Sequence, residues 1–228
     1  MDGAGGIGLF LHEATPKTMN TRKFLQKLAL CLTVVLCLSA IAEKKEGWQA
    51  IFNGKNLAGW KITDPNPFWK VVEGVLVGEN DAAKEGSIIW TDKAYGDFAI
   101  ECEARWSGEI DSGILFRKAN KGKREFQMQL GVSRSQKRDL TGSFYAGGPE
   151  KYPAAGEVKN LEKFITPGAW NKYRLEAKGD TFTVWLNGKQ AVKYVNANFS
   201  GAGPIGLQIH PGLEMKIEFR NVRVKLIE

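Results

Sequence analysis

Apolar and polar residues alternate along most of the chain after residue 43. The clearest run is 98–106, where Phe, Ile, Cys, Ala and Trp alternate with Ala, Glu, Glu and Arg. A second run, 182–186, ends at Asn187-Gly188, the preferred dipeptide of a two-residue hairpin turn. A period of two is typical of strands with one buried face, and no stretch has the period of a convincing amphipathic helix. The sequence therefore predicts an all-β protein.

The remaining pattern favours one antiparallel β-sandwich. After Phe219 the apolar positions change from odd to even numbers, which predicts a bulge near Arg220-Asn221. Only 161–164 favours a short helical turn. No internal repeat or Pro-rich linker divides the chain, and its 26 glycines and seven tryptophans suit a sandwich with many turns and a bulky core. Further strands are predicted at 68–72, 74–78, 86–90, 112–117, 125–131, 171–178 and 204–209.

The first 42 residues are interpreted as a leader. Residues 19–42 combine a basic start, an apolar stretch at 28–38 and Ala40-Ile41-Ala42, the pattern of a secretory signal peptide. The apolar stretch is short for a membrane span, so contact with the membrane is expected only through this export signal; an uncleaved anchor is the alternative. Residues 1–18 are interpreted as an over-extended start, and 43–228 are expected to form the mature domain, periplasmic or secreted.

Charge and cysteine content exclude several classes of protein. Removing the four basic and two acidic residues of 1–42 from totals of 32 and 25 leaves 28 and 23, a net charge of +5 spread along the chain. Nucleic-acid binding is not expected, because it requires a basic stripe with stacking aromatics. Cys102 is the one cysteine after residue 42, so an intrachain disulfide and a zinc-finger type of metal site are excluded.

Polar side chains on the predicted strands indicate a site. Glu125, Gln127 and Gln129 share one face of their strand, Gln208 and His210 likewise share one face of theirs, and together they indicate one face of the sheet. Strand alternation also places Arg117 on the face opposite Phe116. Planar amides and a guanidinium suit sugar hydroxyls, although an ordinary solvated sheet face is the alternative. The long Gly- and Pro-containing segment 134–167 is expected at the rim.

Eight short motifs along the chain together resemble those of a known protein family. They are Phe52-Asn53-Gly54-Lys55-Asn56-Leu57-Ala58-Gly59-Trp60, Tyr95-Gly96-Asp97-Phe98, Asp111-Ser112-Gly113-Ile114-Leu115-Phe116-Arg117, Thr141-Gly142-Ser143-Phe144-Tyr145, Gly168-Ala169-Trp170-Asn171, Val184-Trp185-Leu186-Asn187-Gly188, Gly203-Pro204-Ile205-Gly206-Leu207-Gln208 and Phe219-Arg220-Asn221-Val222. In order and spacing the set resembles the 3-keto-disaccharide hydrolase family over essentially all of 43–228.

The resemblance implies a concanavalin A-like jelly roll that cleaves glycosides already oxidised at C3 by a partner sugar dehydrogenase. A C3 ketone acidifies the C2 proton; a base removes it, the C1 substituent leaves, and water adds back. Such an enzyme needs a base near C2, a donor or cation at the C3 oxygen and a donor for the leaving group. No cofactor is required, and participation of a divalent cation is left open.

The catalytic candidates are His210, Arg117, Glu157 and Tyr145. His210 is the base, although a lone strand-end His is more often structural. Arg117 holds the oxyanion, with an ion pair to Glu125 as its alternative role, and Tyr145 donates to the leaving oxygen or anchors a loop. On this hypothesis, Ala at Arg117 or His210 abolishes turnover and leaves the melting temperature nearly unchanged.

The substrate-binding candidates are Asp111, Glu125, Gln127, Gln129 and Gln208, with carbohydrate as the partner. Asp111 and Glu157 are also substitutes for a missing base, because Gln127 and Val132 stand where the family usually has Glu and Asp. This replacement keeps two other functions open: a non-catalytic carbohydrate-binding module and a structural or adhesion domain. One exposed Trp could serve as a sugar platform, without an indication of which.

Overall fold

The computed structural model describes residues 47–118, 125–146 and 156–228. The leader predicted at 1–42 lies outside the described residues, so the export signal stays a prediction. Within the described part, no helix is long and apolar enough to cross a membrane.

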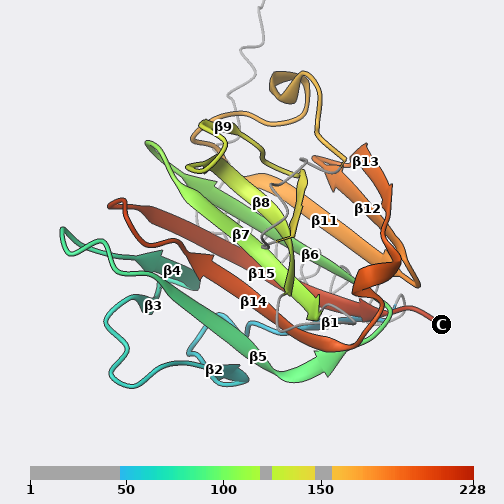
Figure 1. The fold of residues 1–228 in the computed structure, drawn as a ribbon. Coiled ribbons are helices and arrows are strands. Elements are labelled where there is room, and N and C mark those ends of the chain that lie inside the picture. The colour runs from blue at the N-terminus through green and yellow to red at the C-terminus, as the bar shows by residue number, and fades with distance from the viewer. Residues whose placement is uncertain (1–46, 119–124, 147–155) are drawn as a thin grey trace, which may run out of the picture. The chain divides into compact units, whose positions relative to one another are not determined.

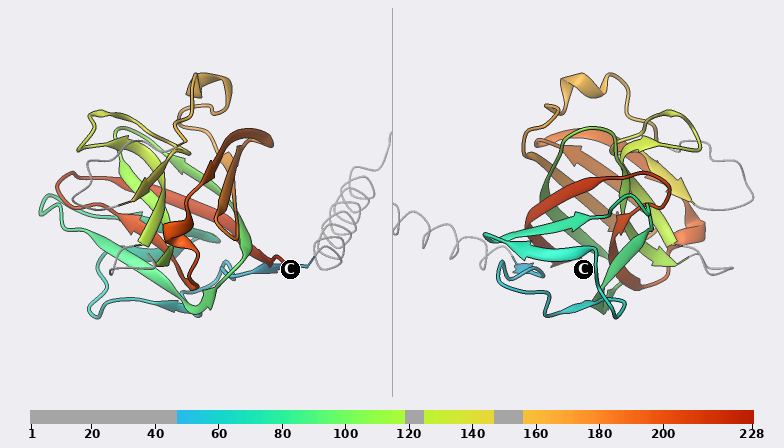
Figure 2. Two further views of the ribbon diagram at one scale, coloured as in Figure 1. Left: turned by 45° about the vertical axis from the view of Figure 1, so that its right-hand side comes forward. Right: turned by 90° about the vertical axis from the view of Figure 1, so that its left-hand side faces the viewer.

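The strands form two antiparallel sheets, seen in Figures 1 and 2. The eight-stranded sheet has the order β13 (Lys189–Val195), β12 (Thr181–Leu186), β11 (Asn171–Lys178), β6 (Phe98–Trp106), β15 (Lys216–Leu226), β4 (Val75–Glu79) and β3 (Trp69–Val72), with β1 (Trp48–Ala50) paired to β15. The seven-stranded sheet has the order β10 (Phe144–Ala146), β8 (Glu125–Ser133), β7 (Asp111–Lys118), β14 (Gly203–Ile209), β5 (Ser87–Tyr95) and β2 (Trp60–Lys61), with β9 (Arg138–Asp139) paired to β8.

The fold class predicted from the alternation is confirmed. Each predicted strand corresponds to an observed one, and 161–164 contains the 3₁₀ turn η1 (Leu161–Lys163); a second turn is η2 (Ala197–Phe199). The register of β15 against β6 shifts between Arg220 and Arg223, which confirms the predicted bulge. Asn187 and Gly188 both have positive φ in the hairpin between β12 and β13, as a type I′ turn requires.

The core between the sheets contains a cluster of phenylalanines. The ring of Phe126 on β8 lies 4.6 Å from that of Phe199, 4.8 Å from that of Phe182 and 5.0 Å from that of Phe144. All four side chains are buried, and full burial of each stabilises the fold by roughly 1.5–3 kcal/mol. Since β8 contributes Phe126 to this core, its alternate side chains are held rigidly on the opposite face.

The segment 134–167 is more structured than the sequence indicates. It contains β9, β10 and η1, and η1 and β9 lie at the same end of the sandwich (Figures 1 and 2). The ion pair between Arg138 and Glu157 joins the two parts of the segment. Residues 147–155, the middle of the predicted rim, lie outside the described residues.

Candidate functional site

The outer face of the seven-stranded sheet carries a connected polar cluster, defined here as Asp111, Gln127, Gln129, Gln208 and His210. Strand alternation produces it: Phe126, Met128 and Leu130 of β8 point into the core, so the glutamines between them point outward. β7 lies between β8 and β14, which brings Asp111 and Gln208 to the same face. The cluster thus combines side chains from three adjacent strands.

Hydrogen bonds fix the cluster. Gln129 Nε2 donates to Asp111 Oδ1 at 2.8 Å, and Gln127 Nε2 donates to Gln129 Oε1 at 2.8 Å and to Gln208 Oε1 at 3.2 Å. Gln129 is fully buried, while Gln208 is partly exposed. Because each amide is oriented by its neighbour, the exposed edge of the cluster presents donors and acceptors in fixed positions.

A glycine makes room for Gln127. Gly113 of β7 faces Gln129 in the register, and a Cβ atom built on Gly113 would overlap the carboxamide of Gln127. The Gln127 side chain therefore lies flat across β7, from where it reaches Gln208 on β14. This close approach explains Gly113 of the motif at 111–117, whereas the preceding Ser112 donates from Oγ to Gln208 O at 2.7 Å.

Asp111 and His210 form the acid-base part of the cluster. The Asp111 carboxylate is 3% exposed and also accepts from the backbone N–H of Arg134 at 3.0 Å. His210 Nδ1 lies 4.0 Å from Asp111 Oδ2 and 2.7 Å from Pro211 O. A carbonyl can only accept, so Nδ1 carries the proton in that hydrogen bond, and Nε2 is then the basic nitrogen of the neutral ring.

Arg134 is a cation that the sequence analysis missed. Its Nη1 donates to Pro211 O at 3.2 Å, the same oxygen that His210 contacts. The exposed Arg134 guanidinium packs so closely on Gly212 that a Cβ there would overlap it. The glycine after His210-Pro211 was the one sequence signal of a close contact at this turn. Nothing in the sequence indicates that the contacting residue is Arg134.

Arg117 does not lie with the cluster, so the face predicted for it is wrong. The register of β7 against β8 skips Arg117, whose φ is +43°, and this bulge turns the side chain into the interior. There it is fully buried and bonds to Asp97 at 2.6 Å. Its other acceptors are the carbonyls of Gly96, Ala177, Gly179 and Phe199.

This arrangement makes Arg117 a structural link between the sheets. Gly96 belongs to the turn that ends β5, whereas Ala177 and Gly179 belong to the end of β11 in the other sheet. Burial lowers the pKa of Arg117, and the Asp97 carboxylate opposes that shift. The pairing with Glu125, the alternative expected for Arg117, is not observed, since the guanidinium pairs with Asp97.

The other predicted residues lie at the margins. Glu125 begins β8, on the same strand face as Gln127, and is half-buried. Glu157 pairs with Arg138, a contact that keeps its carboxylate at the β9 side of the sandwich. Tyr145 lies opposite Gln127 in the register of β10 against β8, but its side chain is outside the described part. Its predicted role stays a prediction.

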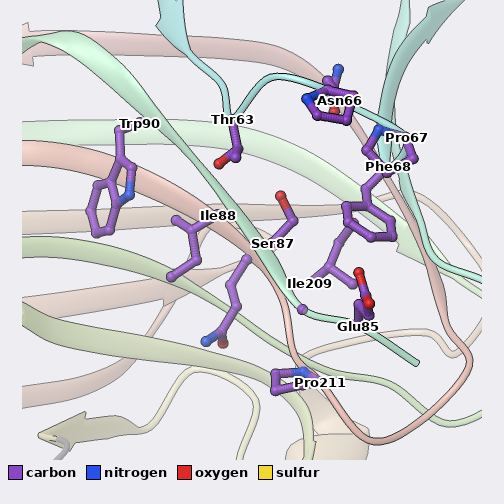
Figure 3. Close-up of a pocket in the computed structure, with 13 residues that line it drawn as sticks. Thr63, Asn66, Pro67, Phe68, Glu85, Ser87, Ile88, Trp90, Ile209 and Pro211 are labelled. Atoms are coloured by element: carbon purple, nitrogen blue, oxygen red, sulfur yellow. The ribbon is translucent and has the colours of Figure 1, made fainter. Parts of the chain in front are cut away.

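A pocket of about 710 Å³ with aromatic and polar walls adjoins the polar cluster (Figure 3). Gln208 belongs to both the cluster and the pocket, and Pro211, the residue after His210, also lines the pocket. The wall is built by Ile88 and Trp90 of β5 together with the loop before β3, which contributes Phe68. A Cβ on Gly206 would lie 2.6 Å from the Trp90 ring, so this glycine lets the indole lie across β14. Trp90 is half-buried and lines this pocket, and the sequence could not single it out among the tryptophans.

The described residues offer no cluster of three or more His, Cys, Asp or Glu side chains that could hold a metal ion. Asp111 and His210 are only two such groups, and the Asp111 oxygens already accept hydrogen bonds from Gln129 and Arg134. Assays with and without added divalent cations therefore test whether a metal ion takes part.

The fold and this polar face define a concanavalin A-like, carbohydrate-active class of β-sandwich. The chain belongs to the 3-keto-alpha-glucoside-1,2-lyase-like domain family, whose model matches residues 47–225. This confirms the resemblance drawn from the motifs. Among curated proteins, no sequence matches the chain.

Solved structures agree on the fold. A candidate glycosyl hydrolase from Parabacteroides distasonis is similar with 26% identity and a TM-score of 0.62, over 82% of this chain and 97% of that one. A second from the same organism has 20% identity and a TM-score of 0.60, over 79% and 99%. The carbohydrate-binding module CBM66 from Bacillus subtilis has 18% identity and a TM-score of 0.51, over 78% and 95%.

Proposed function

We propose that the protein cleaves 3-keto-glycosides, with His210 as the base that removes the C2 proton. The observation that carries this proposal is the position of His210, whose Nδ1 is held by Pro211 O and faces the buried Asp111 carboxylate at 4.0 Å. That arrangement leaves Nε2 basic. It also stabilises the imidazolium that forms when Nε2 accepts a proton.

The proton transfers and the stabilisation of the enolate are then each assigned to a residue. The C2–H bond breaks, its proton moves to His210 Nε2, and its electron pair forms an enolate with the C3 carbonyl. Arg134, exposed beside His210, stabilises the negative oxygen in the role first expected for Arg117. The enolate expels the C1 oxygen, which takes the proton from the imidazolium. Water then adds across the C1–C2 double bond, giving net hydrolysis.

The glutamines bind the sugar in this proposal. Gln208 is partly exposed and linked through Gln127 to Gln129, so its amide is held in one orientation. Hydroxyl groups on the ring need both donors and acceptors, and a carboxamide supplies both. A partner dehydrogenase that oxidises C3 supplies the substrate, and export to the periplasm or beyond the cell is part of the same proposal.

A carbohydrate-binding module is the second candidate. Gln127 replaces a Glu of the family pattern, and the one carboxylate in the cluster, Asp111, is already hydrogen-bonded. A site of this kind could recognise a sugar without turning it over. The two candidate functions predict different results: the enzyme cleaves a glycoside that carries the keto group, whereas the binding module does not.

The test compares 4-nitrophenyl 3-keto-glucosides with their unoxidised parents, in both anomeric forms, with and without added divalent cations. We expect 4-nitrophenol release from a keto substrate alone, because only the ketone acidifies the C2 proton. Release from parent and keto substrate at equal rates would contradict the elimination route. Saturable binding without release would establish the module instead.

A further inference from the structure

The pocket beside the polar cluster has a chemical character of its own. Trp90 stands at one end and Phe68 at the other, with Ile88 and Ser87 between them (Figure 3). Pro65, Pro67 and Pro211 add further apolar surface. The volume of about 710 Å³ lies in the range of small-molecule sites. Two aromatic rings and three prolines form walls suited to a flat apolar group.

Several polar side chains of the pocket are already used within the protein. Asn66 donates from Nδ2 to Trp69 O at 2.8 Å and accepts from Trp69 N–H at 3.0 Å. Ser87 Oγ accepts from Trp69 Nε1 at 3.1 Å. These bonds reduce what the wall can offer to the many hydroxyls of a second sugar, which lose solvent on entry and need new partners.

The pocket also lies at the right distance from the polar cluster. Gln208 of β14 lies opposite Ile88 of β5 in the register, and adjacent strands are about 5 Å apart. A sugar ring that lies over β7 and β14 with its C1 side facing β5 would direct its C1 substituent toward Trp90. Glu85 at the pocket margin is acidic and disfavours a negatively charged substituent.

We infer that this pocket binds the aglycone and that it selects an uncharged, planar aromatic group. The inference rests on the proposed function, because it takes the sugar to lie on Gln208 and Gln127. It adds the class of leaving group: phenolic glycosides are bound more tightly than alkyl glycosides or disaccharides. Contacts with the rings of Trp90 and Phe68 account for the higher affinity for phenolic glycosides.

The test measures binding to the full chain carrying His210→Gln, which should not consume the substrate. Phenyl and methyl 3-keto-β-glucosides and a 3-keto-disaccharide are titrated by calorimetry. We expect the phenyl glucoside to bind at least tenfold more tightly than the other two. Trp90→Ala should remove this preference and leave the affinity for the methyl glucoside unchanged. Trp170→Ala is the matched control, because Trp170 packs against Arg105 and Arg220 and does not line the pocket.

Equal affinities for the phenyl and methyl glucosides, or tightest binding of the disaccharide, would overturn the inference while sugar binding itself stands. If no keto sugar binds, the proposed function fails. Binding of phenol alone then tests whether the pocket accepts an aromatic group. In the wild-type chain, millimolar phenol should then shift the NMR signal of the Trp90 indole N–H, assigned with Trp90→Phe. An unmoved signal would overturn the inference.

Discussion

Replacing Arg117 by Ala is expected to lower the melting temperature by roughly 10 °C. The guanidinium is fully buried, and its removal leaves the Asp97 carboxylate and four backbone carbonyls without their donor. The Asp97 carboxylate is partly exposed, but the buried carbonyls of Ala177 and Phe199 are left unpaired at roughly 1–3 kcal/mol each, or about 2–6 kcal/mol of unfolding free energy in all. Each kcal/mol corresponds to roughly 2–4 °C for a domain of this size. Thermal unfolding followed by circular dichroism measures the effect.

Two further variants separate geometry from charge. Arg117→Lys keeps the positive charge but lacks the planar fork that reaches several carbonyls, so most of the loss should persist. Lys70→Ala removes an exposed pair with Glu79 and should change the unfolding free energy by less than about 1 kcal/mol. A melting temperature unchanged in Arg117→Ala, with turnover lost, would contradict the structural role and restore the catalytic one.

The second large effect is expected on turnover. His210→Ala should slow 4-nitrophenol release from a 3-keto-glucoside by about 10²–10⁴-fold, the usual contribution of a general base. The melting temperature should stay near that of the wild type, because the side chain is partly exposed beyond the end of β14. Initial rates and thermal unfolding on the same preparation measure both quantities.

His210→Gln provides the matched variant, because a carboxamide can hydrogen-bond but cannot accept the C2 proton. It should lose turnover as His210→Ala does, yet keep affinity for the sugar. Near-normal rates in His210→Gln would show that His210 positions the substrate and that another group is the base. A large drop in melting temperature for both variants would instead assign His210 a structural role.

Much of the fold could be predicted because it depends on patterns that are local in sequence. Alternation located most of the strands, though not the short β1, β2, β9 and β10, and the change of parity after Phe219 located the bulge in β15. Asn187-Gly188 located a hairpin. Such signals are carried by the residues that form the element, so no knowledge of distant partners is needed.

The site was predicted only where simple alternation holds. Gln127, Gln129 and Gln208 lie on one face as expected, and Asp111 joins them. Arg117 was misplaced because a bulge reverses its direction, and its apolar neighbours Leu115 and Phe116 give no warning of a positive φ. A bulge of this kind is stabilised by distant carbonyls that alternation cannot reveal.

Trp90 and Arg134 were missed for a related reason. The roles of both depend on contacts between segments more than 70 residues apart: Trp90 lies across Gly206, and Arg134 contacts Pro211 and Gly212. Each contact is marked by a glycine, but a glycine in a strand or turn has many explanations. Only the assembled sheet shows that these two serve close approach.

The most direct test of the account is exchange of the C2 proton. Methyl 3-keto-glucoside, which has a poor leaving group, is incubated with the full chain in D₂O, and the C2–H signal is followed by proton NMR. We predict that the protein accelerates loss of this signal well above the uncatalysed rate, and that His210→Gln does not. Binding of the sugar without any acceleration of exchange or cleavage would contradict proton abstraction at this site.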